Sequence, residues 1–377
     1  MSVTVRVLAT GVAVAAAAVA FAGNAAAAPT SNRPAQGGQV FVQTDDPAGN
    51  SIAVYDRSRD GSLLPAGTYP TGGLGGVLQG AVVDDLASQG SLAYDRARHL
   101  LYAVNAGSNT ITVFAVHGDR LQRLEVVPSG GAFPVSITVH GALLYVLNAR
   151  DGGSIQGFLR FGGLLLPVPA WHRALGLDSS ETPEFTSTPG QVAFTPDGRR
   201  LVVTTKNNGN QLDVFDVGRF GDLAAQPVVT ADPGAVPFAV AFDAAGRVDV
   251  AEAGTNAVAS FRVNRDGSLT LLGRVATGQQ ATCWITRVRH SLYVMNAASG
   301  TVSTFAVHRD GLTGGALSAT DPGTIDAAAS SNGRYLYVQT GGAGTVDGFA
   351  IGREGALSRI GSVTVPGGAG GEGIAAS

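Results

Sequence analysis

Cysteine, lysine and aromatic residues are scarce in this sequence of 377 residues. Its single cysteine, Cys283, excludes an intramolecular disulfide and any zinc site built from cysteines. Lys206 is the only lysine, no block of basic residues occurs, and the net charge is −3. We therefore expect no broad phosphate-binding surface and no nucleic-acid partner. Hydrophobic residues make up 45% of the chain, which excludes a wholly disordered protein.

Sequence motifs for metal, cofactor or serine chemistry are missing as well. The six histidines show neither H-x-H nor H-E-x-x-H spacing, and no G-x-S-x-G motif occurs. The glycine-rich runs at 72–76 and 367–371 are not followed by a helical pattern, so they indicate turns and not phosphate-binding loops. We therefore expect neither a metal ion nor a cofactor.

The only long apolar run lies at the N-terminus. Arg6 precedes the run 7–22, and small residues follow it at 25–28. This order predicts a secretory signal peptide over residues 1–27, cleaved after Ala26 or Ala27. An uncleaved membrane anchor is the alternative, because the run approaches spanning length. Residues 28–39 then form a flexible lead-in, and we expect a secreted protein without membrane contact after cleavage.

The rest of the chain is one unit repeated seven times. In each unit a strand-like segment ends in an aromatic residue, at a period of about 45 residues: Tyr55, Phe114, Phe158, Phe215, Phe261, Phe305 and Phe349. Short segments of alternating polarity fill each unit, and turn pairs such as Asp266-Gly267 follow the aromatic residue. Four strands in each unit predict an all-β fold: a seven-bladed β-propeller with four antiparallel strands per blade, over residues 40–377.

The two ends of the repeat are complementary. The first unit begins at its second strand, residues 40–44, and lacks an innermost strand. The tail 372–377 resembles the innermost strand of other units, such as 237–242. We expect this C-terminal strand to complete the first blade and close the ring. An open solenoid is the alternative.

Two of the seven units are longer than the others, by about a dozen residues each. The additional residues lie near 70–89 and 167–188, after the fourth strand of each unit. In a propeller such connections lie on the same face as the loops between second and third strands. Both inserts should therefore border the mouth of the central channel, where extra loop is commonly used for binding. Neutral surface decoration is the alternative.

Positions where one repeat departs from the others are candidates for function. Just after the second strand most units have a small residue, but the fourth unit has Lys206. The second strand of the fifth unit ends in Glu252, where the others end in a small neutral polar residue. We expect Lys206 to hold an anionic group or polarise a carbonyl, and Glu252 to act as a base if burial raises its pKa. A surface ion pair is the alternative.

Further residues of the same arc are expected to contact a ligand: Gln191, Cys283, Trp284 and Asn296. Two of them have structural alternatives, because Trp284 could fill the channel and Cys283 could be a small buried apolar residue. Asp45, Asp326 and Glu372 belong to the adjoining first and last blades, and could converge as an oxygen site for calcium.

The consensus of the repeat resembles that of a known family. Pro-Asp-Gly-Arg, Leu-Tyr-Val-x-Asn, Val-x-x-Phe-x-Val and Asp-Gly are similar to the blade pattern of the seven-bladed lactonase family, which includes the 6-phosphogluconolactonase and 3-carboxymuconate cyclase types. The similarity is clearest at 292–297, 301–307 and 310–311, and covers nearly all of 40–377. It implies a secreted bacterial propeller that acts on a small lactone. The His and Arg residues of family enzymes are absent at 189–191 and 236–238.

Two functions follow from these observations. As an enzyme, the chain would be an exported lactone hydrolase or cyclase-like protein, with Lys206 and Glu252 acting on a small anionic ligand. As a binding module, it would be a non-catalytic propeller that presents Trp171 and Phe185 to a cell-wall or protein partner. We expect a monomer in either case.

Overall fold

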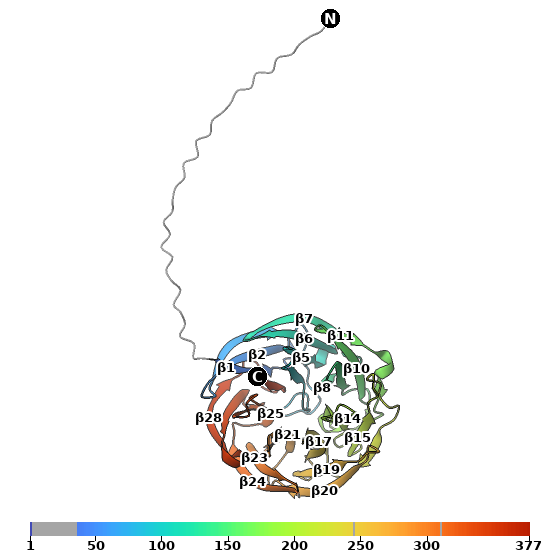
Figure 1. Cartoon of the computed structure of the whole chain (residues 1–377), viewed down its shortest axis with the longest axis vertical. Helices are drawn as coiled ribbons and strands as arrows, with labels where there is room; N and C mark the ends of the chain where they lie inside the picture. Colours follow the sequence, from blue (N-terminus) through green and yellow to red (C-terminus); the bar gives the residue numbers. More distant parts are fainter. Residues whose placement is uncertain (2–35, 244–245, 310) are drawn as a thin grey trace. The chain divides into compact units, whose positions relative to one another are not determined.

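Figure 1 shows a computed structural model of the chain, which describes residues 1, 36–243, 246–309 and 311–377. Apart from Met1, the predicted signal peptide (1–27) lies outside the described residues, as does most of the predicted lead-in (28–39). Residues 35–377 form one compact unit. Within the described residues, no helix is long and apolar enough to cross a membrane.

Seven sheets form a ring in the compact unit, which confirms the predicted seven-bladed propeller (Figure 1). From the centre outward, the first three blades are β29 (Ile374–Ala376), β1 (Gln36–Gln43), β2 (Ser51–Ser58) and β3 (Leu63–Pro70); β4 (Leu92–Asp95), β5 (Leu100–Asn105), β6 (Thr110–His117) and β7 (Arg120–Pro128); and β8 (Pro134–His140), β9 (Leu143–Asn148), β10 (Ser154–Phe161) and β11 (Leu164–Pro167).

The remaining four blades are regular four-stranded sheets. They are β13 (Gln191–Phe194), β14 (Arg200–Thr204), β15 (Gln211–Asp216) and β16 (Val228–Ala231); β17 (Pro237–Phe242), β18 (Arg247–Glu252), β19 (Ala257–Val263) and β20 (Leu269–Ala276); β21 (Thr282–Val288), β22 (Ser291–Asn296), β23 (Thr301–His308) and β24 (Gly311–Ala319); and β25 (Thr324–Ala329), β26 (Tyr335–Thr340), β27 (Thr345–Ile351) and β28 (Leu357–Thr364). Blades are numbered 1 to 7 in this order.

The second strand of a blade is covered by neighbouring blades on both faces. Every residue of β5, β22 and β26 is buried, whereas most residues of the outer strands β7 and β28 are at least partly exposed. This burial explains why the Leu-Tyr-x-Val segments are nearly continuous apolar runs, without the alternation of polar and apolar residues that an outer strand shows.

The tyrosine of the Leu-Tyr-x-Val segment connects one blade to the next. The hydroxyl of Tyr337 in β26 donates to the carbonyl oxygen of Gly61 (2.8 Å), and that of Tyr293 in β22 donates to the carbonyl oxygen of Gly355 (2.9 Å). Both glycines have a positive φ, 92° and 82°, in the turn before the fourth strand. The tyrosine and the Asp-Gly or Glu-Gly turn, which repeat in the sequence, are therefore the two sides of one contact between blades.

The C-terminal strand closes the ring as predicted. β29 pairs antiparallel with β1, with Val40, Phe41 and Val42 opposite Ala376, Ala375 and Ile374. The backbone N–H of Gln43 extends the pairing by donating to the carbonyl oxygen of Gly373 (2.8 Å). Blade 1 is therefore built from both ends of the compact unit, which removes the open seam that a linear array would have.

Two boundaries differ from the sequence prediction. β1 begins at Gln36 and not at residue 40, because Gln36–Gln39 continue to pair with the end of β2. In blade 3 the fourth strand is split: β11 and the short β12 (Arg173–Ala174) both pair with β10, and a 3-10 turn, η2 (Pro169–Trp171), lies between them. The start of the predicted insert 167–188 is therefore part of the blade.

Trp171 is a further correction. The prediction placed it on a surface for a partner, but its side chain is only 7% exposed and stacks on Tyr145, with ring centroids 6.1 Å apart.

Three other short helical segments lie in loops: η1 (Ala106–Ser108), α1 (Glu184–Ser187) and η3 (Arg353–Gly355).

Candidate functional site

The two faces of the ring differ in their loops. One face, here called the mouth face, carries the loops between second and third strands and the connections between blades. The other face, here called the turn face, carries two short turns of each blade: the turn between the first and second strands, and the turn between the third and fourth strands. The segment 71–91 lies across the channel on the mouth face, because it connects blades 1 and 2 and also contacts blade 6.

Contacts to β21 hold this segment over the channel. The indole Nε1 of Trp284 donates to the carbonyl oxygen of Ser88 (2.6 Å). The side-chain amide of Gln89 donates to the carbonyl oxygen of Ile285 (3.0 Å) and accepts from its N–H (2.9 Å). Leu86 and Ala87, directly before these anchors in the chain, are buried. Trp284 therefore helps to close the channel, which was the structural alternative for this residue.

Lys206 fastens both inserts to blade 4. Its side chain is 1% exposed, and its Nζ donates to the carbonyl oxygens of Ala87 (2.7 Å) and Phe185 (2.6 Å) and to the hydroxyl of Thr188 (3.1 Å). Burial lowers the pKa of Lys206 to about 7, while Asp84 acts in the opposite direction. The three donors of the ammonium group are thus used by the protein itself.

We expect Lys206→Met to loosen the covering of the channel. The carbonyl oxygens of Ala87 and Phe185 would lose their donor, at a cost of about 2 kcal/mol in the free energy of unfolding. Hydrogen exchange should become faster in residues 84–90 and 184–188, with the blades unchanged.

The effect of this variant should depend on pH. Because folding lowers the pKa of Lys206 from 10.5 to about 7, the unfolded chain binds more protons than the folded chain between these two pH values. The stability of the wild type therefore rises with pH in this range. The stability difference between wild type and variant should therefore widen from pH 7 to pH 10; a constant difference would contradict this role.

Glu252 has different partners from Lys206. Its side chain is buried and accepts two hydrogen bonds from Arg274 (2.6 and 2.9 Å) and one from the hydroxyl of Thr255 (2.7 Å). Arg274 also bonds Asp232 (2.7 Å). Burial raises the pKa of Glu252, and Arg274 opposes that change. The two residues predicted as the catalytic pair therefore belong to two separate networks.

Beside Lys206 a pocket of about 300 Å³ opens on the mouth face. Its wall combines both inserts with blades 5 and 6, and is formed by Val82, Val83, Asp84, Ala87, Phe185, Phe238, Ala281, Cys283, Trp284, Ala297 and Ala298. The rings of Phe238 and Trp284 pack edge to face with centroids 4.8 Å apart. Such walls suit the apolar part of a small molecule.

Asp84 is the one acidic residue among those that line this pocket. Its oxygens accept from the backbone N–H groups of Leu86 (2.8 Å), Ala87 (2.9 Å) and Ser88 (3.0 Å). Burial nevertheless raises the pKa of Asp84 to about 7, and the charge of Lys206 limits this increase. Burial also raises the pKa of Cys283 to about 12, so its thiol is protonated at neutral pH and is a poor nucleophile.

The predicted ligand-binding residues divide into two groups. Cys283 and Trp284 line the pocket. Gln191 instead accepts a hydrogen bond from the N–H of Val240 in blade 5 (2.6 Å), and Asn296 bonds Thr282 (2.8 Å) and Ser303 (2.9 Å) within blade 6. Gln191 and Asn296 thus hold strands together and are not among the residues that line the pocket.

The acidic residues proposed for calcium are buried together near the channel axis. Asp45 accepts from the N–H of Glu372 (2.8 Å), and Glu372 accepts from the N–H of Gly90 (3.0 Å). Burial raises the pKa of all three, that of Asp326 to about 6, and the charge of Asp326 raises the pKa of Glu372 further. Among the described residues no group of three or more His, Cys, Asp or Glu side chains is arranged to hold a metal.

Asp84 and Phe238 were not predicted from the sequence. Phe238 stands in a strand position where an apolar residue is ordinary. Asp84 lies in the insert 70–89, outside the repeat, so no equivalent position in another blade could reveal it as unusual. The signal available was the pair Asp84-Asp85 directly after two valines, in a segment already identified as a candidate for binding.

Comparison with known proteins identifies the fold. No family model and no curated protein sequence matches the chain. Among solved structures, a periplasmic gluconolactonase of Pseudomonas aeruginosa superposes with a TM-score of 0.74 at 20% identity, over 90% of this chain and 98% of that one. A proposed 6-phosphogluconolactonase of Bacteroides fragilis gives a TM-score of 0.72 at 22% identity, again over 90% and 98%.

A more distant similarity connects the fold to different chemistry. The virginiamycin B lyase of Staphylococcus aureus superposes with a TM-score of 0.51 at 14% identity, over 71% of this chain and 82% of that one. A shared fold does not establish a shared reaction, because function depends on the site. The chain is therefore a lactonase-like seven-bladed propeller in its fold.

Proposed function

We propose that the chain is an exported propeller that opens a lactone ring in the pocket beside Lys206. The observation that carries the proposal is Asp84, a single carboxyl group on the wall of an otherwise apolar pocket of about 300 Å³. A carboxyl group whose pKa lies at about 7 is suited to accept a proton from water near neutral pH. The fold shared with a gluconolactonase supports the same class of reaction.

The reaction follows from the position of Asp84. The carboxylate takes a proton from water, and the resulting hydroxide adds to the lactone carbonyl carbon. The ring C–O bond then breaks, and the leaving alkoxide takes the proton back from Asp84. The product is the open hydroxy acid, so lactone and water are fully accounted for. Lys206 is a positioning residue here, because its charge favours the ionised form of Asp84.

The walls of the pocket favour a substrate with an apolar substituent. Phe185, Phe238 and Trp284 offer no hydrogen bonds at the pocket surface for a polyhydroxylated sugar, and the donors of Lys206 are already used by the protein. We therefore propose an alkyl- or aryl-substituted lactone, in place of the anionic ligand expected from the sequence.

A substrate screen tests this function. The chain is incubated with γ- and δ-lactones that carry alkyl or aryl substituents, and with aldonolactones of the same ring size, and ring opening is followed by proton release. We expect turnover of the substituted lactones, with aldonolactones slower by at least about tenfold. Absence of turnover in both sets would refute the enzymatic proposal.

Non-catalytic binding is the second candidate. It is favoured by the three backbone N–H groups that already hold the Asp84 carboxylate, since a carboxylate used in this way also stabilises the insert. Calorimetry with the same lactones separates the two functions, because a binding protein would give heat of association without ring opening.

Export is also proposed, from the order of charge, apolar run and small residues at the N-terminus. The periplasmic location in the name of one structural neighbour is consistent with it. When the full chain is expressed in a bacterium, N-terminal sequencing of the exported protein should find Ala27 or Ala28 as its first residue. Retention of Met1 on a membrane-bound product would indicate an uncleaved anchor instead.

A further inference from the structure

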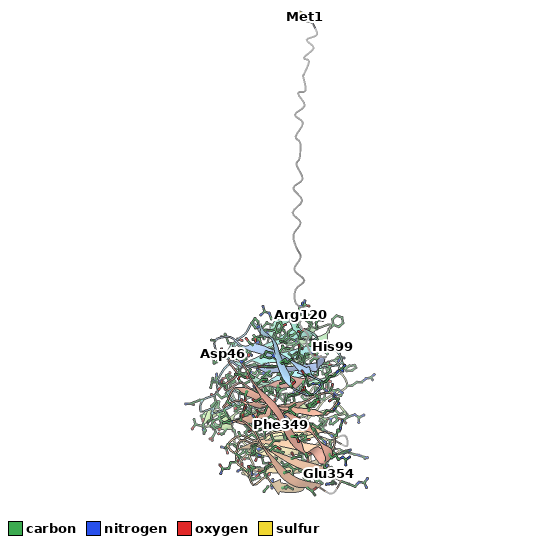
Figure 2. The ribbon with its side chains drawn as sticks, turned by 90° about the vertical axis from the view of Figure 1, so that its left-hand side faces the viewer. Met1, Asp46, His99, Arg120, Phe349 and Glu354 are labelled. Carbon is green, nitrogen blue, oxygen red and sulfur yellow. The ribbon has the colours of Figure 1, made fainter. Side chains whose placement is uncertain are left out.

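The arginines of the propeller gather on the turn face. Figure 2 shows Asp46 on the opposite side of the ring from His99 and Glu354, which mark the turn face. On the described turns of this face and the strand ends next to them, twelve arginines but only six carboxylates are exposed. The arginines come from six different blades, so they are far apart in the sequence. The chain therefore has a positively charged face, although its net charge is −3 and its sequence contains no block of basic residues.

The positive charge is concentrated on both sides of blades 3 and 4. The exposed arginines of blade 4 are balanced by its own carboxylates. Blade 2 exposes three arginines on this face, one of which, Arg98, pairs with the half-buried Asp95 (3.0 Å), and blades 5 to 7 each expose more arginines than carboxylates among the described residues. A cleft of about 600 Å³ between blades 5 and 6 has four arginines on its walls.

Two phenylalanines project from the same face on blades 3 and 4. Phe161 is 75% exposed and Phe220 is 76% exposed, whereas the other phenylalanines of the described chain are buried or half-buried. Phe161 ends β10 directly before Gly162, and Phe220 lies directly before Gly221 in the turn after β15, so each is at the connection between the third and fourth strands. The guanidinium of Arg219 lies 5.7 Å from the ring centre of Phe220. Folding alone does not explain two large apolar side chains at the tips of neighbouring turns.

We propose that the turn face docks on the surface of an anionic lipid bilayer. Phe161 and Phe220 enter the boundary between headgroups and acyl chains, and the arginines of blades 2 and 5 to 7 bind lipid phosphates on both sides of them. Charge and apolar insertion together are the combination that peripheral membrane binding requires. A soluble polyanion would use the arginines but would leave the two phenylalanines without a role. The proposal does not depend on the lactone reaction, and it replaces the expectation that the cleaved protein has no membrane contact.

Vesicle sedimentation tests the proposal. The chain is produced without residues 1–27, because their apolar run would itself bind lipid; all the described strands remain, since the first of them, β1, begins at Gln36. We expect binding to phosphatidylglycerol vesicles and at least about tenfold weaker binding to phosphatidylcholine vesicles. Binding should decrease several-fold when salt rises from about 0.05 to 0.5 M.

Matched variants assign the binding to the named residues. Phe161→Ser with Phe220→Ser should weaken binding to anionic vesicles roughly tenfold, and Arg265→Gln with Arg309→Gln should reduce both the affinity and its dependence on salt. Leu317→Ser, at an apolar residue of β24 that is 51% exposed, and Arg123→Gln on β7 are the controls and should bind as the wild type does. All six substituted positions are exposed, and thermal melting verifies that each variant is folded.

Three results would overturn the proposal. The first is no sedimentation with phosphatidylglycerol vesicles at low salt. The second is unchanged vesicle binding in the double phenylalanine variant. The third is binding to heparin at the same affinity with or without the two phenylalanines, together with no binding to vesicles, which would assign the turn face to a polyanion.

Discussion

A chain that ends at Gly373 should lose the cooperative fold of the propeller or melt at least roughly 10 °C lower than the full chain. The deletion removes β29, whose residues Ile374, Ala375 and Ala376 are all buried. It leaves the inner edge of β1 unpaired at the centre of the ring, and it removes the carbonyl oxygen of Ala376, which accepts two hydrogen bonds from Arg96 of blade 2. An unpaired edge of this kind is also a site for aggregation.

The effect should be graded with the number of contacts removed. Ile374→Ala keeps the strand and removes only packing, so we expect a loss of about 2–4 kcal/mol in the free energy of unfolding. Removal of Ser377 alone deletes its hydrogen bonds to Gln39 and those that its carbonyl oxygen accepts from Arg57 and Ser331, but it keeps the three buried residues of β29 and should cost less than the longer deletion. Calorimetry measures the thermal stability of all three variants: the chain that ends at Gly373, Ile374→Ala, and the chain without Ser377. Equal melting temperatures for the full chain and the chain that ends at Gly373 would show that β29 does not close the ring.

Asp84→Asn should reduce the rate of ring opening at least about a hundredfold, because an amide cannot take a proton from water. In the wild type only the ionised form of Asp84 is the base, so the rate should rise with pH and reach half its maximum near pH 7, the pKa given to Asp84 by burial. Since the charge of Lys206 lowers the pKa of Asp84, Lys206→Met should move that midpoint to higher pH. A purely structural lysine would lower the rate without moving the midpoint.

The neighbouring carboxyl group provides the control. Asp85 is adjacent to Asp84 in the insert but does not form part of the pocket wall, so Asp85→Asn should keep the wild-type rate and pH profile. The Asn side chain at position 84 also places an amide near the N–H of Ser88, and the melting temperature of the variant must therefore be measured with the rate. An Asp84→Asn protein that folds and turns over lactone at the wild-type rate would remove Asp84 from the mechanism.

Most of the fold could be predicted because the propeller repeats its local signals. The aromatic residue at the end of the third strand, the Leu-Tyr-x-Val segment and the Asp-Gly turn occur in unit after unit, and each depends on residues close together in the chain. The spare strand at the C-terminus and the missing strand at the N-terminus were visible for the same reason. The split fourth strand of blade 3 was not predicted, because the residues around Trp171 carry no repeat signal.

The candidate site was only partly predictable, because comparison between repeats detects unusual residues but not their partners. Lys206, Glu252, Cys283 and Trp284 were identified, and two of them line the pocket. Nothing in the repeat pattern indicates that Glu252 bonds Arg274, or that Lys206 donates to carbonyl groups of both inserts. Asp84 was missed because it lies outside the repeat.

The blade pattern and the closure of the ring were determined by the sequence itself, since hydrophobic alternation and turn residues act over a few neighbouring positions. The distribution of charge and the composition of the pocket were decided only in the tertiary structure. Arginines from six blades meet on one face, and a segment between blades 1 and 2 reaches blade 6, because ring closure brings together residues that are hundreds of positions apart. No local pattern records such distances, and for this reason a chain of net charge −3 carries a basic face.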